Sequence, residues 1–591
     1  MLAVADNVYY MWDESTNSVV QAPGTGRADK PFGRDRRKYG TLELGDIKPS
    51  LEGRWIVDTL DGEVEVTTVF ELLKEESENY KPEMASEITG VSAKVIEQTA
   101  KIFAEADPGR NYAGYASCKW LHGDLLQRAM LLLLALTGST GKEGGGLQIA
   151  NSPNARGLTQ FGFSDVGPAF RLISSTTWDY DHADMKELNQ KIYGNDLAEK
   201  FDRYYKKSIE EDWFPDYSKN GWKMGIFAGN NGANWRATGS TWRKTAFEEL
   251  ETIVSLAPDM GVTSLYSDYV LPIAHHYERN DLMLQSRVPY LQVLNEAVPP
   301  LGEAVDDWEA NRRLAEAISR RAKERNIKPI QDAVDGRTVR RDYTKTLELY
   351  TMGGRVNNSK DVAQFIINAS HGIPKISFEE LSQKGIVKVE GVENTMWEKD
   401  ESPYHNEIVK SVRKKLPYET FTGRQQFYID HEWFIEFGET LPTFKEPLKI
   451  DEFPLRMMMG HARHGIHSTW RDDSFLLSLQ RGEPDIYVNP DDAINRGVED
   501  GDMIRIYNTA GEFFAMAHVS SGIQPGMLFM YHGWDPKMFK GGKNFSEVIP
   551  TGGLIKPTSM AGDYGHLGYQ PLAFAPNQTY KDFTCDFEKS A

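Results

Sequence analysis

Hydrophobic and polar positions alternate in the first quarter of the chain in patterns that predict short strands and amphipathic helices. Apolar residues recur at strand spacing on both sides of an Asp-Gly turn and at helical spacing in two later stretches. Together they predict an α/β domain over residues 51–165. The predicted elements are a hairpin at 54–69 turning at Asp61-Gly62, a helix at 92–106, a strand at 111–116 and a helix at 124–136 with Asp124 as its N-cap.

The next region has the element order of a βαβ unit, with a predicted buried strand at 223–228 and another strand at 252–257. A helix near 242–251 connects them, and a strand at 269–273 and a helix near 306–325 follow. Ligands of such units bind at the carboxyl ends of the strands. We therefore predict a second α/β domain over residues 166–330 whose strand-end loops bind a ligand.

The pattern changes twice more. Residues 331–446 are polar and irregular, which predicts a connecting region with short helices such as 359–369. Residues 447–591 alternate in short runs separated by Gly and Pro turns, which is typical of a compact β-barrel. With residues 1–50 as the end of an interrupted α/β domain, the predicted fold is multidomain α/β, with doubly wound α/β domains and a C-terminal barrel.

Charge and cysteine content exclude several classes of partner and of metal site. The net charge of -19 argues against non-specific nucleic-acid binding and against an anionic membrane surface. With Cys118 and Cys585 as the two cysteines, this chain supports neither a disulfide framework nor a cysteine-based zinc or iron–sulfur site. The apolar run 130–136 is too short to span a bilayer, and the N-terminus has no signal-peptide core. Because the chain opens directly into a predicted strand, we expect it to be truncated.

The most informative segment is 460–469, which carries three imidazoles, a guanidinium and two hydroxyls between glycines after a predicted strand. Glycine allows close backbone approach, and Arg463 offers a planar set of donors. The segment therefore predicts binding of a large, polar, anionic ligand, although a surface loop rich in histidine has the same composition. Glycine-rich polar loops at 531–534, 551–553 and 561–570 add to this prediction.

Two loops follow the predicted βαβ strands. Residues 229–235 carry glycines and asparagines suited to a phosphate or sugar, and Asp259 has the acceptors for a guanine edge or a ribose. A tight turn and a helix cap are the structural alternatives. Neither loop has the GxGxxG spacing, and the glycine-rich run 137–146 is not a P-loop because Glu143 follows Lys142.

A further candidate is the segment 117–124, which places Lys119 and His122 beside a helix start. A solvated lysine and a structural histidine are the alternatives. No nucleophile elbow, HExxH motif or paired-carboxylate spacing occurs, so a hydrolase is disfavoured.

In their order along the chain, these segments resemble the molybdopterin-dependent oxidoreductases of the dimethyl sulfoxide reductase family, and more narrowly the catalytic α subunits of its type II branch. The matching segments are 88–91, 136–146, 263–272 and 460–469. The resemblance implies a bis(molybdopterin guanine dinucleotide) cofactor with molybdenum and a double-psi-type barrel. It implies dinucleotide contacts by Asn231, Asn234, Asp259 and Thr263, and pterin and phosphate contacts by His461, Arg463, His464, His467, Ser468, His532 and Gln570.

The chain departs from the family in one respect. The family's [4Fe-4S] domain and, in type II members, an aspartate ligand of molybdenum lie upstream of the first residue here. We therefore expect the cluster only in a missing N-terminal region, and we predict no metal ligand in this chain.

Within the branch, the segments 117–124 and 174–180 look closest to ethylbenzene dehydrogenase and steroid C25 dehydrogenase. This resemblance implies water-dependent hydroxylation of a hydrocarbon, with Lys119 as a pocket cation and His122 as the weaker candidate. Reduction of nitrate, selenate or chlorate, or oxidation of dimethyl sulfide, is the first alternative. A metal-free remnant that acts in binding or assembly is the second, and another nucleotide-dependent α/β enzyme is the third.

Partners and location follow from the resemblance alone. Type II α subunits imply an iron–sulfur β subunit, a haem-b γ subunit and a small-molecule substrate. They also imply a periplasmic location through a twin-arginine signal; without that signal the protein would be cytoplasmic.

Overall fold

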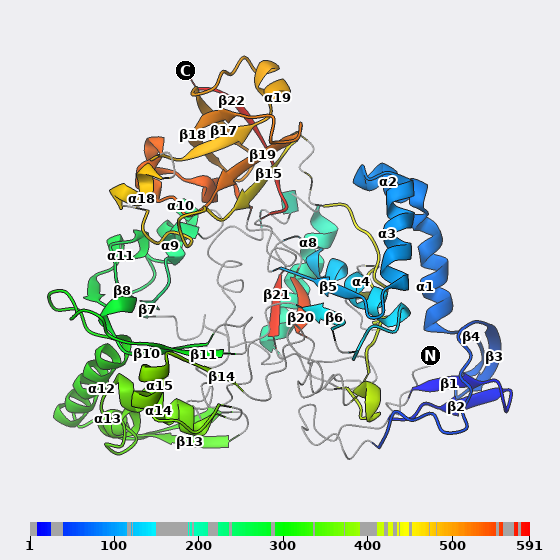
Figure 1. Cartoon of the computed structure of the whole chain (residues 1–591), viewed down its shortest axis with the longest axis horizontal. Coiled ribbons are helices and arrows are strands. Elements are labelled where there is room, and N and C mark those ends of the chain that lie inside the picture. The colour runs from blue at the N-terminus through cyan, green and yellow to red at the C-terminus, as the bar shows by residue number, and fades with distance from the viewer. Residues whose placement is uncertain are drawn as a thin grey trace.

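The structure is a computed structural model of the chain, and Figure 1 shows its arrangement. It describes residues 9–24, 40–114, 120, 122–142, 144–148, 187, 190–191, 194–210, 223–235, 239–284, 290–334, 337–370, 373–389, 411–418, 424–429, 434–435, 438–447, 449, 452–471, 473–479, 482–550, 555–559, 573–576 and 581–590. Two groups of elements face each other: the barrel above the βαβ unit on one side, and the N-terminal hairpins and helices on the other (Figure 1).

The N-terminal elements follow the predicted order. The second hairpin turns one residue earlier than expected, because Gly62 (φ 109°) pairs with Thr59 and leaves Leu60-Asp61 as the loop. The predicted helix at 92–106 is confirmed as α3. The elements are β1 (Tyr10–Asp13), β2 (Ser18–Gln21), β3 (Arg54–Thr59), β4 (Gly62–Thr67), α1 (Val69–Ser77), α2 (Pro82–Thr89) and α3 (Ala93–Glu105).

The helix α4 (Gly123–Leu136) begins with His122, not Asp124, at its N-cap. Asp124 instead lies in the first turn, where its charge complements the helix dipole. Gly138, with φ 63°, ends the helix as predicted. Beside α4, the short strands β5 (Arg110–Tyr112) and β6 (Gly146–Gln148) pair in parallel.

The predicted βαβ unit is confirmed as a parallel sheet of order β7-β8-β9. Two details of the prediction were wrong. The strand at 224–228 exposes alternate side chains, and the helix after it begins earlier, as two short helices. The elements are β7 (Met224–Ala228), α9 (Gly232–Trp235), α10 (Gly239–Thr245), β8 (Thr252–Ala257), α11 (Val262–Leu265) and β9 (Tyr269–Pro272).

Residues beyond 330 contribute a strand and two helices to a second small core. β14 (Ile386–Lys388) extends the hairpin of β10 (Asp281–Leu284) and β11 (Tyr290–Leu294), although the expected domain boundary at residue 330 separates them. The domain boundary at residue 330 stays a prediction, although β11 before it and β14 after it pair in one sheet. The neighbouring elements are α12 (Asp307–Glu324), β12 (Ile330–Val334), β13 (Arg337–Arg341), α13 (Thr346–Tyr350), α14 (Ser359–Ala369) and α15 (Phe378–Lys384).

The predicted C-terminal barrel is confirmed as a closed barrel of order β15-β19-β16-β18-β17-β22. Its strands alternate buried and partly exposed residues, and the inward residues form a continuous apolar core. The elements are β15 (Leu455–Gly460), α18 (Ser474–Ser478), β16 (Asp485–Val488), α19 (Pro490–Ile494), β17 (Met503–Tyr507), β18 (Glu512–Val519), β19 (Met527–Tyr531) and β22 (Thr584–Lys589).

The remaining α-helix and β-strands of the described residues are α8 (Asn195–Glu210) and the paired strands β20 (Ile555–Ser559) and β21 (Ala573–Pro576). Among the described helices, none combines the length and apolar character needed to cross a membrane.

Candidate functional site

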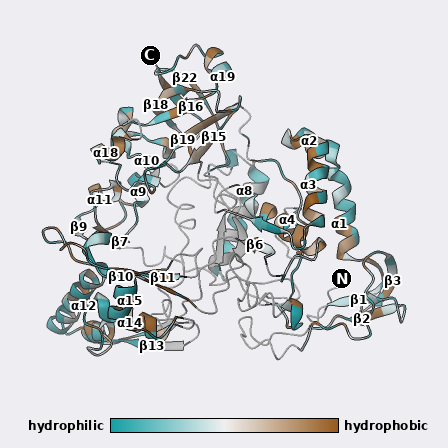
Figure 2. Cartoon of the chain, viewed as in Figure 1, coloured by the Kyte–Doolittle hydropathy of each residue, from teal (hydrophilic) through white to brown (hydrophobic). Residues whose placement is uncertain are grey.

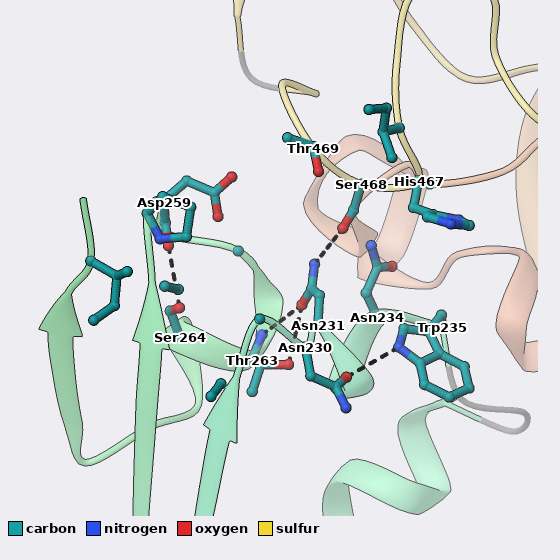
Figure 3. Close-up of a pocket in the computed structure, with 18 of the residues that line it drawn as sticks. Asn230, Asn231, Asn234, Trp235, Asp259, Thr263, Ser264, His467, Ser468 and Thr469 are labelled. Atoms are coloured by element: carbon teal, nitrogen blue, oxygen red, sulfur yellow. Dashed lines mark hydrogen bonds between the residues drawn. The ribbon is translucent and has the colours of Figure 1, made fainter. Parts of the chain in front are cut away.

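A cavity of about 950 Å³ opens between the carboxyl ends of β7 to β9 and the loops of the barrel (Figure 3). Its lower wall comes from the loops after β7 and β8 and from residues after β9. Its upper wall comes from the loop 461–469 and from the segment after β19. The volume is at the upper end of the range usual for small-molecule sites, so it suits a large ligand.

The lower wall is built around Asn231, which the short helix α9 follows. The Asn231 Oδ1 accepts a hydrogen bond from the Thr263 backbone N–H at 3.0 Å, and Thr263 Oγ1 accepts one from Ala233 N–H at 3.1 Å. These bonds tie together the loops after two neighbouring strands. Asp259 extends along the same wall and is exposed (Figure 3).

Hydrogen bonds join the two walls. Asn231 Nδ2 donates to Ser468 Oγ at 2.9 Å, which links the βαβ unit to the barrel loop (Figure 3). Asn234 is 2% exposed, and its Nδ2 donates to Asp535 Oδ1 at 3.1 Å. Asn544 Nδ2 donates in turn to Asn234 Oδ1 at 2.7 Å. The relative position of the two walls is therefore set by the protein itself.

A buried ion pair reinforces this junction. Arg243 Nη2 of α10 lies 3.2 Å from Glu547 Oε1 of the barrel, and both side chains are at most 7% exposed. Ser240 donates to the same carboxylate through its backbone N–H and its hydroxyl, at 3.0 and 2.5 Å. Sequence patterns did not single out these residues, because their partners are some 300 positions apart in the chain.

Three histidines meet at the upper wall. His467 Nδ1 and His532 Nε2 are 2.9 Å apart, and the His461 ring centroid is 4.6 Å from that of His532. Burial is the main cause that lowers the pKa of His532 to about 4; the contact with the Gly460 carbonyl opposes the shift, and the neighbouring His461, His467 and Arg471 add to it. Burial also lowers the pKa of His467. At neutral pH these two imidazoles are uncharged, so they offer hydrogen bonds more than charge to a ligand.

Most of the predicted binding residues share this cavity. The predicted residues that line it, among others, are Asn231, Asn234, Asp259, Thr263, His461, His467, Ser468 and His532. Arg463 and His464 belong to the same barrel loop but are exposed and do not line the cavity. Gln570 and Lys119 lie outside the described residues.

His122 lies elsewhere, at the N-cap of α4. Its Nδ1 is 3.5 Å from Glu439 Oε1, a carboxylate that is fully buried and also lies 3.0 Å from Lys445 Nζ. Arg128 of the same helix donates to the Glu439 carbonyl at 2.6 Å. These contacts fit the structural alternative for His122, and its catalytic role stays a prediction.

Comparisons with known families agree with this geometry. Residues 455–562, which include the barrel strands β15 to β19, match the family model of the molydopterin dinucleotide binding domain. Residues 113–317, which include the βαβ unit, match the molybdopterin oxidoreductase model. The two matched regions carry the two walls of the cavity.

Individual relatives match nearly the whole chain. Dimethylsulfide dehydrogenase subunit alpha of Rhodovulum sulfidophilum is 31% identical over 99% of this chain and 63% of its own length. Perchlorate reductase subunit alpha of Dechloromonas aromatica is 33% identical over 98% of this chain and 63% of its own length. The chain thus spans less than two thirds of these relatives.

Among solved structures, acetylene hydratase from Pelobacter acetylenicus has a similar fold, with a TM-score of 0.56 and 18% identity. The match covers 88% of this chain and 66% of that one.

Proposed function

We propose that this chain, which belongs to the molybdopterin oxidoreductase family, forms the cofactor-holding part of a catalytic α subunit that binds bis(molybdopterin guanine dinucleotide) with molybdenum. The observation that supports the proposal most directly is that the βαβ loops and the barrel loops share one cavity. A ligand with a nucleotide end and a pterin end requires hydrogen-bonding groups from both sides of such a cleft.

The donor set fits this ligand. Amides, hydroxyls and backbone N–H groups at strand ends are suited to phosphates, ribose and a base edge. Burial lowers the pKa of two imidazoles at the upper wall, His467 and His532, so this wall presents polar rings without added positive charge. Bound there, the cofactor supplies the two-electron chemistry, and the chain holds and orients it.

We assign the residues by wall. Asn231, Asn234, Asp259 and Thr263 face one dinucleotide, with the Asp259 carboxylate accepting from a guanine edge. For pterin and phosphate contacts we propose His461, His467, Ser468 and His532 of the upper wall. On the family resemblance we add Arg463 and His464, from the same loop, and Gln570, which lies outside the described residues.

For the substrate, we propose water-dependent hydroxylation of a hydrocarbon, such as ethylbenzene or a sterol side chain, with Lys119 as the pocket cation and His122 as the weaker candidate. The similarity of the segments 117–124 and 174–180 to hydrocarbon dehydrogenases supports it. A second candidate is reduction of an oxyanion or oxidation of dimethyl sulfide, which the names of the similar perchlorate reductase and dimethylsulfide dehydrogenase subunits favour.

Partners and location belong to the same proposal. The similar proteins are named as alpha subunits, which supports an assembly with an iron–sulfur β subunit and a haem-b γ subunit. We propose a periplasmic location, on the resemblance to type II enzymes.

Cofactor content tests the proposal. The chain, purified from a host that makes the cofactor and then denatured, should release guanine nucleotide together with molybdenum. Asp259→Ala should lower the guanine content, whereas Asp61→Ala, an exposed carboxylate in the β3–β4 loop, should leave it unchanged. A folded chain without guanine nucleotide would contradict the proposal. Release of nucleotide without molybdenum would favour the alternative of a metal-free remnant that acts in binding or assembly.

Substrate is tested separately, in the full-length enzyme with its partners. Oxidation of ethylbenzene with an artificial electron acceptor would support the hydrocarbon candidate. Reduction of nitrate, chlorate or perchlorate without hydrocarbon oxidation would replace it by the second.

A further inference from the structure

We propose that His461, His467 and His532 form a binding site for a divalent transition-metal ion in the cofactor-free chain. One ring nitrogen of each residue lies within 4.8 Å of the other two. This ion would be distinct from the molybdenum of the proposed cofactor. The inference does not depend on the proposed function, because it concerns the chain without its cofactor.

The barrel brings the first two ligands together. β15 and β19 are parallel neighbours, and Gly460 at the end of one pairs with Tyr531 at the end of the other. The next residue of each strand is a histidine, so the register of the sheet places His461 beside His532, with ring centroids 4.6 Å apart. This juxtaposition follows from the parallel register of the two barrel strands.

The third ligand is held by a strained loop. His467 has a φ of 52°, which is uncommon for a residue other than glycine, and a bridge between Ile466 and Thr469 closes the turn around it. Gly533 packs so closely that a Cβ on it would lie 1.9 Å from the His467 carbonyl oxygen. Strain of this kind persists where the surrounding structure requires it, and here it directs the imidazole toward the other two.

His532 makes the backbone hydrogen bond through its second ring nitrogen that metal-binding histidines usually make. Its Nδ1 lies 2.5 Å from the Gly460 carbonyl oxygen, so Nδ1 carries the proton and donates it. Nε2 is then an acceptor, and it points at His467. A backbone carbonyl that fixes the tautomer and leaves Nε2 free to coordinate is the common arrangement in zinc sites.

The nitrogen spacing suits coordination. His467 Nδ1 and His532 Nε2 are 2.9 Å apart, near the roughly 3.4 Å that separates two nitrogens bound to a tetrahedral ion at about 2.1 Å. In the metal-free chain a proton on His467 Nδ1 bridges the two rings. On binding, this proton moves to Nε2 of the same ring, so both nitrogens offer lone pairs and no oxidation occurs.

The ligand type defines the class of ion. Imidazole suits zinc, copper, nickel and cobalt, whereas magnesium and calcium require oxygen. Burial lowers the pKa values of His467 and His532, so both are in the neutral form that coordinates a metal at pH 7. Three such ligands leave a fourth position for water on a tetrahedral ion.

Titration of the cofactor-free chain with Co²⁺ and Zn²⁺ tests the inference. We expect one tightly bound ion per chain, with the visible absorption of four-coordinate Co²⁺ that Zn²⁺ then displaces. His461→Ala and His467→Ala should each weaken binding by about tenfold or more. His518→Ala removes a barrel histidine that is paired with Asp500 and lies outside the cluster, so it should leave the affinity unchanged.

Far-UV circular dichroism of each variant controls for folding. His461 is exposed, so its replacement has the smallest effect on packing, and His461→Gln provides a second variant if alanine disturbs the loop. Equal affinity in a folded His461 variant and in the unaltered chain would overturn the inference. A chain that releases guanine nucleotide when loaded but binds no Co²⁺ when cofactor-free would refute the metal site and leave the proposed function standing.

Discussion

The barrel and the helices α1 to α3 have equally clear hydrophobic patterns but very different burial. Inward barrel residues such as Met457, Ile486 and Phe513 are 0% exposed. In the part of the chain that the structure describes, no residue of α1, α2 or α3 is buried, and Ile102 on the apolar stripe of α3 is 69% exposed. Figure 2 shows hydrophobic positions along α3 as well as on the strands of the barrel.

The difference shows that a hydrophobic pattern in the sequence does not by itself determine burial. Periodicity predicts which residues share a face, whereas burial requires a second surface against that face. The barrel supplies its own second surface because its sheet closes on itself, so every inward residue meets another across the interior. The barrel is therefore stabilised by contacts among its own strands. The helices α1 to α3 do not bury their apolar faces in this way.

The largest expected effect comes from the barrel core. Phe513→Ala removes a fully buried ring, so we expect the free energy of unfolding of the barrel to fall by about 4 kcal/mol. Ile102→Ala in α3 is the matched change at an exposed apolar position, and we expect less than about 0.5 kcal/mol. Denaturant titration followed by circular dichroism measures both. Similar losses from the two substitutions would contradict the comparison.

The rate at which Cys585 is alkylated provides a second test of the stability of the barrel. Cys585 is fully buried in β22, and burial raises the pKa of its thiol, so the reactive thiolate is disfavoured even in alkaline buffer. In a Cys118→Ser variant it is the one remaining cysteine. We expect alkylation to be slower by about 10³-fold or more than in the denatured chain, since the barrel must open first.

Rapid alkylation of Cys585 at low denaturant would show that the barrel opens readily and is not the stable unit. Combining Cys118→Ser with Phe513→Ala provides the control, because weakening the core should accelerate labelling.

The sequence predicted the strands of the barrel well, but it misplaced the start of α4 and the helix after β7. Asp485–Val488 and Met503–Tyr507 agree residue for residue, because their alternation is unbroken and turn residues bound them. The cap of α4 was misplaced by two residues, since both His122 and Asp124 stand near its start and spacing does not decide between them. The helix predicted near 242–251 was misplaced: α10 begins at Gly239 and ends at Thr245, and the short helix α9 precedes it.

The candidate site shows the same limit. Loops rich in glycine, asparagine and histidine at strand ends were recognisable one by one, and parallel-strand geometry implied that those of the βαβ unit would meet. The pairing of Asn231 with Ser468, and of Arg243 with Glu547, depends on how two domains dock. Such docking leaves no local pattern, because each partner alone resembles an ordinary polar surface residue.

The ion pair of Arg243 and Glu547 tests whether docking holds the molecule together. Glu547→Gln keeps the shape but leaves the Arg243 charge buried, so we expect a loss of about 3 kcal/mol in the free energy of unfolding. Glu588→Gln, in an exposed pair with Arg505, should cost less than about 1 kcal/mol. Thermal unfolding of both variants at equal salt measures the difference, and equal losses would mean that the junction adds little.

The smallest effect concerns the hydrogen bond that crosses the cavity. Ser468→Ala removes the acceptor of the Asn231 amide, and because this bond is only partly buried we expect about 1 kcal/mol. Asn231 also holds Thr263 through its Oδ1, and that bond remains in the variant. The lower wall should therefore keep its shape while its link to the barrel weakens. Calorimetry would then show barrel and βαβ transitions that separate more than in the unaltered chain. If they remain coincident, the buried contacts of Glu547, Asn544 and Asp535 are enough to join the two walls. The polar loops that line the cavity are then available for a ligand.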